Sequence, residues 1–190
     1  MKLRTDDINF VIDTILAEAK KKDADPVYHR VDPEKIGVMG HSLGGSAALG
    51  IGRQREDVNA VVALEAPFMY DIVGVADGEF IWNDKPYPIP VLNIYSDSAW
   101  SHLDEWKEYA ENNALLSDTG ATAFNVYIAG VGHLDLTDLA LESPFLTNML
   151  MGHESTTSAE YCLKTINEVV LQFFDSYLKG KGSFTAEGTY

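Results

Sequence analysis

The chain has 190 residues, of which 46% are apolar and 23% are charged, and these values are ordinary for a globular protein. The 14 Lys and Arg residues against 29 Asp and Glu residues give a net charge of −15, which argues against binding to nucleic acid or to an anionic membrane surface. The single cysteine, Cys162, excludes an internal disulfide and argues against a cysteine-based zinc site. No apolar run approaches the roughly 20 residues that cross a bilayer, so no membrane span is expected.

Helical and strand patterns alternate along the chain. They predict one α/β domain over residues 1–190, with a mainly parallel sheet of about four strands flanked by helices. An amphipathic helix is expected first, with Thr5 as its N-cap. A hairpin turning at Asn83 and Asp84 is expected later, and the last residues are expected to be frayed. The expected helices are 6–22, 46–53, 101–116, 138–152 (broken at Pro144) and 158–179; the expected strands are 35–39, 60–64, 91–95 and 123–128; the hairpin is 78–87 and the frayed tail 181–190.

The sharpest motif is the run GHSLGG at residues 40–45, which has the G-x-S-x-G pattern of a nucleophile elbow. It lies between a predicted strand and a predicted small-residue helix, as this motif requires. A tight turn there would push the Ser42 hydroxyl clear of the backbone, and a side chain at Gly40 or Gly44 would collide with neighbouring elements. The N–H of Leu43 is the predicted oxyanion donor. The alternative is a glycine-rich turn without chemistry.

A serine nucleophile needs a general base, and the chain order in this architecture is serine, then acid, then histidine. Among the five histidines, only His133 directly follows a predicted strand, on a glycine-rich turn, and it is the predicted base. His29 precedes the serine, and His41 lies inside the motif and is expected to point away from the hydroxyl. His102 and His153 lie at a helix start and in a polar loop. The alternative for His133 is a loop histidine that bonds only to backbone.

Two carboxylates end predicted strands between the serine and the histidine, and either could orient the imidazole. Glu65 lies between an apolar strand and an Ala-Pro-Phe run, where a buried carboxylate would need a partner. Asp97 lies in a Ser-Asp-Ser run, where a solvated turn role is natural. We favour Glu65 as the triad acid and keep Asp97 open. The alternative for Glu65 is a structural acid in a salt bridge.

Residues 31–45, 63–67, 90–96 and 130–133 carry a resemblance to a known family. On them the chain resembles the α/β-hydrolase superfamily and, more narrowly, the branch of platelet-activating-factor acetylhydrolases and dienelactone-hydrolase-like esterases. In the acetylhydrolases the acid follows the strand after the nucleophile helix, which corresponds to Glu65, although the family usually has Asp there. Most other α/β-hydrolases carry the acid one strand later, near Asp97.

The resemblance also implies a shortened sheet. Family members have several strands before the nucleophile strand, whereas this sequence starts at the helix that precedes it. The nucleophile strand would then be an exposed edge, and the loop that normally supplies a second oxyanion donor would be missing. Because an open apolar edge invites pairing, we expect a homo-oligomer that covers this edge or the face of the first helix.

Together these features predict a serine carboxylic ester hydrolase that acts on short-chain acyl esters through an acyl-enzyme on Ser42, in a Ser42–His133–Glu65 triad. No metal and no organic cofactor is expected, and the expected partner is a small ester substrate. The single cysteine and the absence of a signal-like N-terminus favour the cytoplasm. Two alternatives stay open: a truncated, weakly active or inactive hydrolase that serves as a protein-interaction scaffold, and a peptidase or amidase with the same triad.

Two segments, 67–88 and 134–160, are expected as excursions near the active site. Their large apolar side chains are candidates to line the acyl pocket, with ordinary core packing as the alternative. These candidates are Phe68, Met69, Phe80, Trp82, Phe145, Leu146 and Met149.

Overall fold

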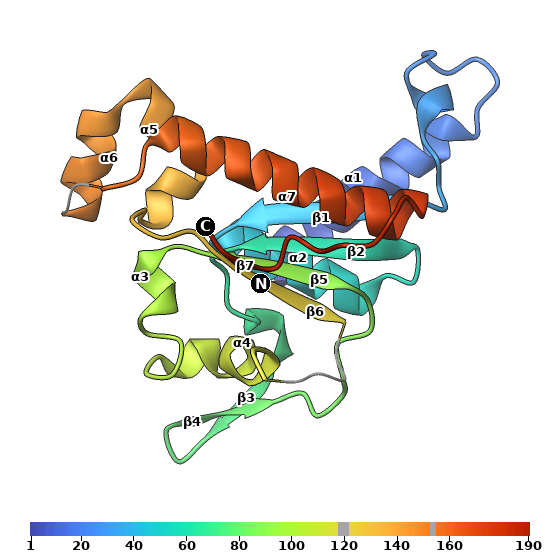
Figure 1. The fold of residues 1–190 in the computed structure, drawn as a ribbon. Helices are drawn as coiled ribbons and strands as arrows, with labels where there is room; N and C mark the ends of the chain where they lie inside the picture. Colours follow the sequence, from blue (N-terminus) through green and yellow to red (C-terminus); the bar gives the residue numbers. More distant parts are fainter. Residues whose placement is uncertain (118–121, 153–154) are drawn as a thin grey trace.

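A five-stranded parallel sheet forms the centre of the fold (Figure 1). The computed structural model describes residues 1–117, 122–152 and 155–190. The strand order is β1-β2-β5-β6-β7, so the α/β class and the mainly parallel sheet are confirmed, and the sheet has one strand more than expected. Its strands are β1 (Ile36–His41), β2 (Val58–Leu64), β5 (Val91–Tyr95), β6 (Ala123–Tyr127) and β7 (Gly188–Thr189).

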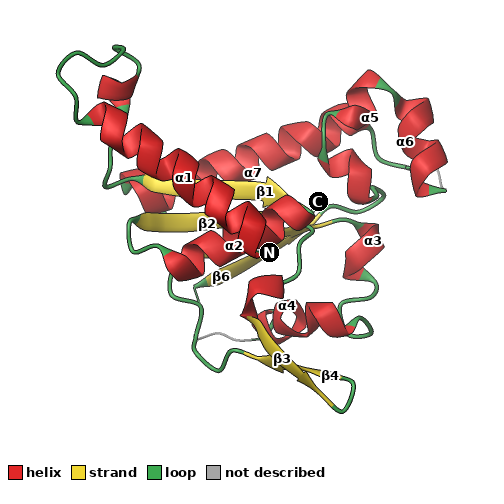
Figure 2. Cartoon of the chain, turned by 180° about the vertical axis from the view of Figure 1, so that it is seen from behind, coloured by secondary structure: helices red, strands yellow, loops and turns green. Residues whose placement is uncertain are grey.

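Helices cover both faces of the sheet. The two views show α7 (Ala159–Lys179) along one face and α1 (Lys2–Ala19) with α2 (Leu43–Gln54) along the other (Figures 1 and 2). The shorter elements are α3 (Asp97–Trp100), α4 (Ala110–Leu115), α5 (Leu139–Glu142), α6 (Pro144–Met151) and the 3-10 turns η1 (Tyr28–Arg30), η2 (Met69–Asp71), η3 (Lys107–Tyr109) and η4 (His133–Leu136). Within the described residues, none of the helices combines the length and the apolarity that crossing a membrane would need.

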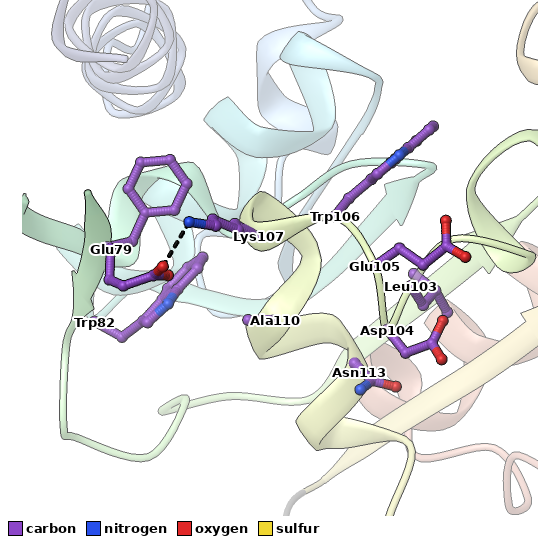
Figure 3. A pocket seen from close by; sticks show the side chains of 10 residues that line it. Glu79, Trp82, Leu103, Asp104, Glu105, Trp106, Lys107, Ala110 and Asn113 are labelled. Carbon is purple, nitrogen blue, oxygen red and sulfur yellow. Dashed lines mark hydrogen bonds and ion pairs between the residues drawn. The ribbon is translucent and has the colours of Figure 1, made fainter. Parts of the chain in front are cut away.

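A separate antiparallel hairpin lies beside α4. It joins β3 (Ile72–Ala76) to β4 (Glu79–Trp82), and an ion pair of 2.5 Å between Glu79 and Lys107 links it to η3 (Figure 3). The hairpin turns at Asp77 and Gly78, both with positive φ, and not at residues 83–84 as expected. Asp-Gly is a favoured pair for such a turn, so the sequence carries a signal for the observed turn at residues 77–78.

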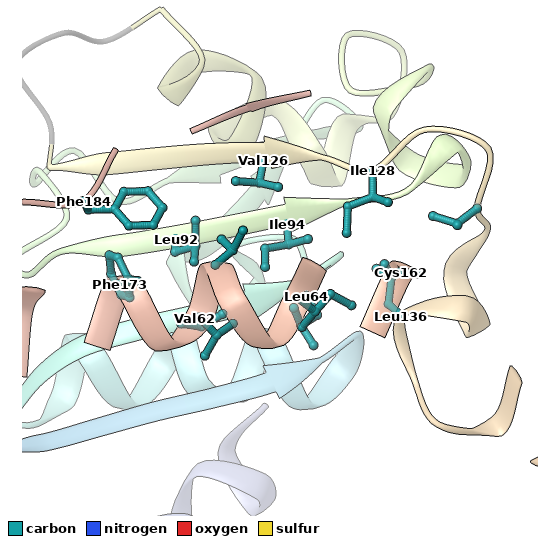
Figure 4. Packing of buried hydrophobic residues seen from close by; sticks show 14 of the residues in the cluster. Val62, Leu64, Leu92, Ile94, Val126, Ile128, Leu136, Cys162, Phe173 and Phe184 are labelled. Carbon is teal, nitrogen blue, oxygen red and sulfur yellow. The ribbon is translucent and has the colours of Figure 1, made fainter. Parts of the chain in front are cut away.

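Two apolar clusters hold the layers together. Alternate residues of each strand point to opposite faces, so Val62 and Leu64 of β2 face α7, whereas Val61 and Ala63 face α2. Phe173 of α7 fills the first cluster and is fully buried (Figure 4). Burial on both faces explains why residues 60–64 of β2 form an uninterrupted apolar run in the sequence.

The first and third expected helices differ from the structure. Thr5 is not an N-cap, because α1 already begins at Lys2 and Thr5 is buried inside it. The stretch 101–116 is not one helix: α3 ends at Trp100, and η3 and α4 follow after a series of turns.

The C-terminal tail packs on the sheet, so the expectation of a frayed end is wrong. Phe184 is buried against the rings of Phe124 and Phe173. Beyond it, β7 pairs with β6, and the N–H of Tyr190 donates to the carbonyl of Tyr127 at 2.9 Å. The tail therefore covers the edge that β6 would otherwise expose.

The opposite edge of the sheet is open among the described residues. There β1 pairs only with β2, its residues are half-buried or exposed, and Met39 is 49% exposed. A groove of about 350 Å³ runs between β1 and α1 and is lined mostly by apolar side chains, including Ile12, Leu16 and Val38.

Candidate active site

Ser42 lies in a sharp turn between β1 and α2. Its backbone has φ 55° and ψ −126°, a region that residues other than glycine rarely adopt. Two hydrogen bonds hold this conformation: the Ser42 N–H donates to the Leu64 carbonyl at 2.8 Å, and the Ser42 carbonyl accepts from the Ser46 N–H at 3.0 Å. Leu43 is the first residue of α2, so its N–H has no acceptor within the helix.

Two glycines of the motif are required by close packing. A Cβ at Gly40 would lie 2.4 Å from the carbonyl of Gly44, and a Cβ at Gly45 would lie 2.6 Å from the Cβ of Ala66. The expected collision at Gly40 is therefore present. A Cβ at Gly44 would meet no atom within 4 Å, so the second crowded position is Gly45 and not Gly44.

Glu65 and His133 meet beside this turn. Glu65 follows β2, has φ 45° and is only 2% exposed. One carboxylate oxygen, Oε1, accepts from His133 Nδ1 at 2.9 Å, and the other, Oε2, accepts from the Ser96 N–H at 2.7 Å. A buried carboxylate is costly without partners, and here both oxygens have one. His133 begins η4, which follows β6 after a short glycine-containing loop.

The other candidate acid, Asp97, points elsewhere. Its carboxylate accepts from the hydroxyl of Tyr127 at 2.6 Å and from the N–H of Gly130 at 3.1 Å. The carboxylate as hydrogen-bond acceptor raises the pKa of Tyr127 to about 12. Asp97 therefore fixes the loop that leads to His133 and makes no hydrogen bond to its ring among the described residues.

Comparisons with known proteins agree with this arrangement of strands, turn and helices. A ferulic acid esterase from Streptomyces cinnamoneus has a similar solved structure, with a TM-score of 0.66 and 22% sequence identity, over 96% of this chain and 49% of that chain. The chain therefore has an α/β-hydrolase fold. A sequence profile of the PET hydrolase-like family matches residues 2–73. No curated protein matches the chain significantly.

The chain spans about half the length of that esterase. The matched profile covers α1, the turn at Ser42 and β2, and ends within β3 of the hairpin. The comparisons do not test the narrower resemblance to acetylhydrolases and dienelactone-hydrolase-like esterases, which stays a prediction. The turn at Ser42 lies at the carboxyl end of β1 in the parallel sheet, where ligand sites in open α/β sheets are found.

A cavity of about 360 Å³ opens at this end of the sheet, and Ser42, Glu65 and His133 all line it. Met69, one of the candidates to line an acyl pocket, also lines this cavity. The remaining lining residues are Leu43, Ser46, Pro67, Ser98, Trp106, Glu108 and Tyr109. Trp106 and Tyr109 were not among the candidates, because the sequence suggested an uninterrupted helix there. The turn at residues 107–109 is what brings them to the cavity.

Most of the other expected pocket residues lie elsewhere. Phe68 is buried in the core beneath α2. Phe80 and Trp82 line a neighbouring cavity of about 260 Å³, which shares Trp106 with the first (Figure 3). The three candidates on α6 line neither of these two cavities, and their exposed fractions are 79% for Phe145, 36% for Leu146 and 59% for Met149.

His41 makes a contact that the sequence does not reveal. Its ring packs on the ring of His133, with centroids 4.3 Å apart, and its Nε2 donates to the His133 carbonyl at 2.9 Å. His29 and His102 do not line the cavity, and His153 lies outside the described residues. In residues 1–117, 122–152 and 155–190, no group of three or more His, Cys, Asp and Glu side chains is arranged to hold a metal ion.

Proposed function

We propose that the protein is a serine carboxylic ester hydrolase. The observation that carries this proposal is the hydrogen bond of 2.9 Å between Glu65 and His133 Nδ1, in a cavity that Ser42 also lines. A carboxylate on Nδ1 fixes the ring orientation and leaves Nε2 of the neutral imidazole unprotonated, so that it can accept a proton. The names of the similar proteins, a PET hydrolase-like family and a ferulic acid esterase, both denote hydrolysis of esters and support the same class.

The proposed reaction has two halves. His133 Nε2 takes the proton of the Ser42 hydroxyl while Oγ attacks the ester carbonyl carbon, and Glu65 stabilises the imidazolium that forms. The Leu43 N–H, at the start of α2, donates to the negative oxygen of the tetrahedral intermediate. The intermediate expels the alcohol, which takes the proton from His133. Water then attacks the acyl-Ser42 with His133 as base, and the acid is released.

The cavity favours small, uncharged acyl groups. Its volume is about 360 Å³, and Pro67, Met69, Trp106 and Tyr109 supply apolar and aromatic surface. Glu108 in its lining and the net charge of −15 disfavour anionic substrates. We therefore propose short-chain, neutral esters as substrates.

A fluorophosphonate probe tests the nucleophile directly. We expect one labelled peptide, containing residues 36–53, together with hydrolysis of p-nitrophenyl acetate and butyrate. Both should be lost in Ser42→Ala and retained in Ser117→Ala, a control in which an exposed serine is changed. Label on another peptide, or esterase activity that survives Ser42→Ala, would overturn the assignment.

Labelling and turnover, together with matched ester and amide substrates, separate an esterase from a binding scaffold and from a peptidase or amidase. A binding scaffold that keeps the elbow without chemistry would show neither labelling nor turnover. A peptidase or amidase would cleave anilides or peptides at rates comparable to matched esters. We expect ester cleavage to be faster, because an alcohol is a better leaving group than an amine and an ester carbonyl is more electrophilic than an amide carbonyl.

The exposed edge of β1 supports a second proposal, that two copies of the chain associate there. Met39 on this strand is 49% exposed, and the apolar groove beside α1 adjoins it. Light scattering should then show a concentration-dependent mass, which Met39→Lys reduces. The matched control is Val73→Lys, which changes a 65% exposed residue on the separate hairpin. A mass of one chain at all concentrations would contradict the proposal.

A further inference from the structure

We propose that His41 is a positioning residue, which fixes the backbone of His133 relative to Ser42. The inference rests on the proposed function, since it concerns the same base and nucleophile. His41 is the last residue of β1 and directly precedes Ser42. Its Nε2 lies 2.9 Å from the backbone carbonyl oxygen of His133. A carbonyl oxygen can only accept, so this ring nitrogen carries a proton and donates it.

Among the described residues, three hydrogen bonds tie His133 to other elements, and they fix different parts of it. Its N–H donates to Ser98 Oγ at 3.1 Å, its Nδ1 donates to Glu65 at 2.9 Å, and its carbonyl accepts from His41. Ser98 and Glu65 follow β5 and β2. Only the bond from His41 comes from the residue adjacent to the proposed nucleophile, so it joins base and nucleophile most directly.

The hydrogen bond between His41 and His133 links two segments that the sheet itself keeps apart. The strands β1 and β6, which lead to Ser42 and to the His133 turn, are separated by β2 and β5. At about 4.8 Å between neighbouring strands, their axes lie about 14 Å apart. Side chains must therefore bridge the two segments, and the contact of His41 with the backbone of His133 is one such bridge.

A neutral ring at His41 is compatible with the positive charge that His133 gains as the proposed base. The two ring centroids are 4.3 Å apart, with planes tilted by 39°. Burial lowers the pKa of His41, and the charge of the neighbouring His133 lowers it further, while the hydrogen bond to the His133 carbonyl and the charge of Glu65 act in the opposite direction. A neutral His41 donates its hydrogen bond without adding a second positive charge next to the imidazolium of His133.

Three substitutions distinguish the contribution of the His41 hydrogen bond from that of its aromatic ring. His41→Phe keeps an aromatic ring and removes the donor, and His41→Met removes both with a side chain of similar reach. His41→Gln removes the ring but keeps an N–H donor near the position of Nε2. We expect kcat for p-nitrophenyl butyrate to fall by about 10- to 100-fold in the first two, with KM changed by less than about twofold, because base and nucleophile lose their alignment while the cavity stays intact. In His41→Gln we expect most of this loss to be restored.

The matched control is His29→Phe. His29 makes the same kind of bond, from Nε2 to the carbonyl of Lys21 at 3.1 Å, but is exposed and does not line the cavity. Its kcat should equal that of the unchanged protein. Wild-type kcat in His41→Phe or His41→Met, or a kcat of His41→Gln as low as theirs, would overturn the inference. If one of the donor-free variants does not fold, the other decides.

Failure of the proposed function would look different. It would appear as activity or labelling that persists in Ser42→Ala, or as no labelling and no turnover in the unchanged protein. Loss of labelling in Ser42→Ala, combined with an unchanged His41→Phe, would contradict only the positioning role of His41.

Discussion

Replacing Glu65 by Gln tests the proposed acid with almost no change in shape. The Glu65 carboxylate accepts two hydrogen bonds, from the backbone N–H of Ser96 at 2.7 Å and from His133 Nδ1 at 2.9 Å. An amide has one oxygen and one NH₂ group. The Ser96 N–H can only donate, so the amide oxygen turns toward Ser96 and the NH₂ group faces His133.

His133 can keep a hydrogen bond to the side chain at position 65 only by changing its tautomer. Nδ1 must then accept from the amide, and the proton moves to Nε2, which no longer takes the proton of Ser42. The loss of the acid's charge also removes the stabilisation of the imidazolium. In triads that have been tested this way, such a change lowers kcat by about 10⁴, equivalent to about 5.4 kcal/mol at 1.36 kcal/mol per tenfold.

Asp97→Asn is the matched comparison. Its side-chain oxygen can still accept from Gly130 and Tyr127, and Asp97 does not touch the His133 ring, so we expect kcat to fall by no more than about tenfold. Both variants are assayed with p-nitrophenyl acetate, and their folding is checked by circular dichroism. Equal kcat values, or a larger loss in Asp97→Asn than in Glu65→Gln, would refute the reasoning and return Asp97 as the acid.

Three further predictions concern the scaffold. Gly40→Ala places a Cβ 2.4 Å from the carbonyl of Gly44, so we expect it to abolish fluorophosphonate labelling and to lower the melting temperature, and a normally labelled protein would contradict the close packing. Arg53→Met leaves the 2% exposed carboxylate of Asp71 without its ion pair of 2.7 Å, which should cost about 3–5 kcal/mol in urea unfolding; a loss below about 1 kcal/mol would show that water replaces the arginine. Because the pKa of His41 lies below its ordinary value of 6.5, the unfolded chain binds more protons, so stability should fall as pH falls from about 6.5 towards that lowered pKa. Thermal unfolding of His41→Gln should show a smaller fall over the same pH interval, and an equal fall would assign the effect to other groups.

Much of the fold is readable from local patterns. β5 was predicted with its observed bounds, Val91–Tyr95, because a short and mostly apolar run begins directly after Pro90. The last helix was placed within one residue of α7, since its apolar stripe is regular and Gly180 ends it in the left-handed region. The tail was misjudged because the packing of Phe184 depends on Phe124, about 60 residues earlier, and no local pattern reveals such a contact.

The candidate site was readable only in part. Ser42 lies in a recognisable sequence motif and His133 directly follows a predicted strand, so both could be identified as candidates from the sequence. The choice between Glu65 and Asp97 depends on which carboxylate reaches the ring, and spacing along the chain does not determine that distance. The contact between His41 and His133 was missed for the same reason, because it depends on a turn that lies 92 residues further along the chain.

The positive φ values at Ser42 and Glu65 follow from one feature of the sheet. β1 and β2 are paired so that His41 lies opposite Leu64, and Leu64 lies opposite Ile94 of β5, so the strands end at one level. The ladder then continues one step further: the Ser42 N–H donates to Leu64 at 2.8 Å, and the Glu65 N–H donates to Ile94 at 2.7 Å. These bonds hold both residues to the sheet while their backbones turn away from the strand direction. Conformations that are unfavourable for isolated residues persist where the surroundings over-determine them, and here the ladder does so at the proposed nucleophile and the proposed acid together.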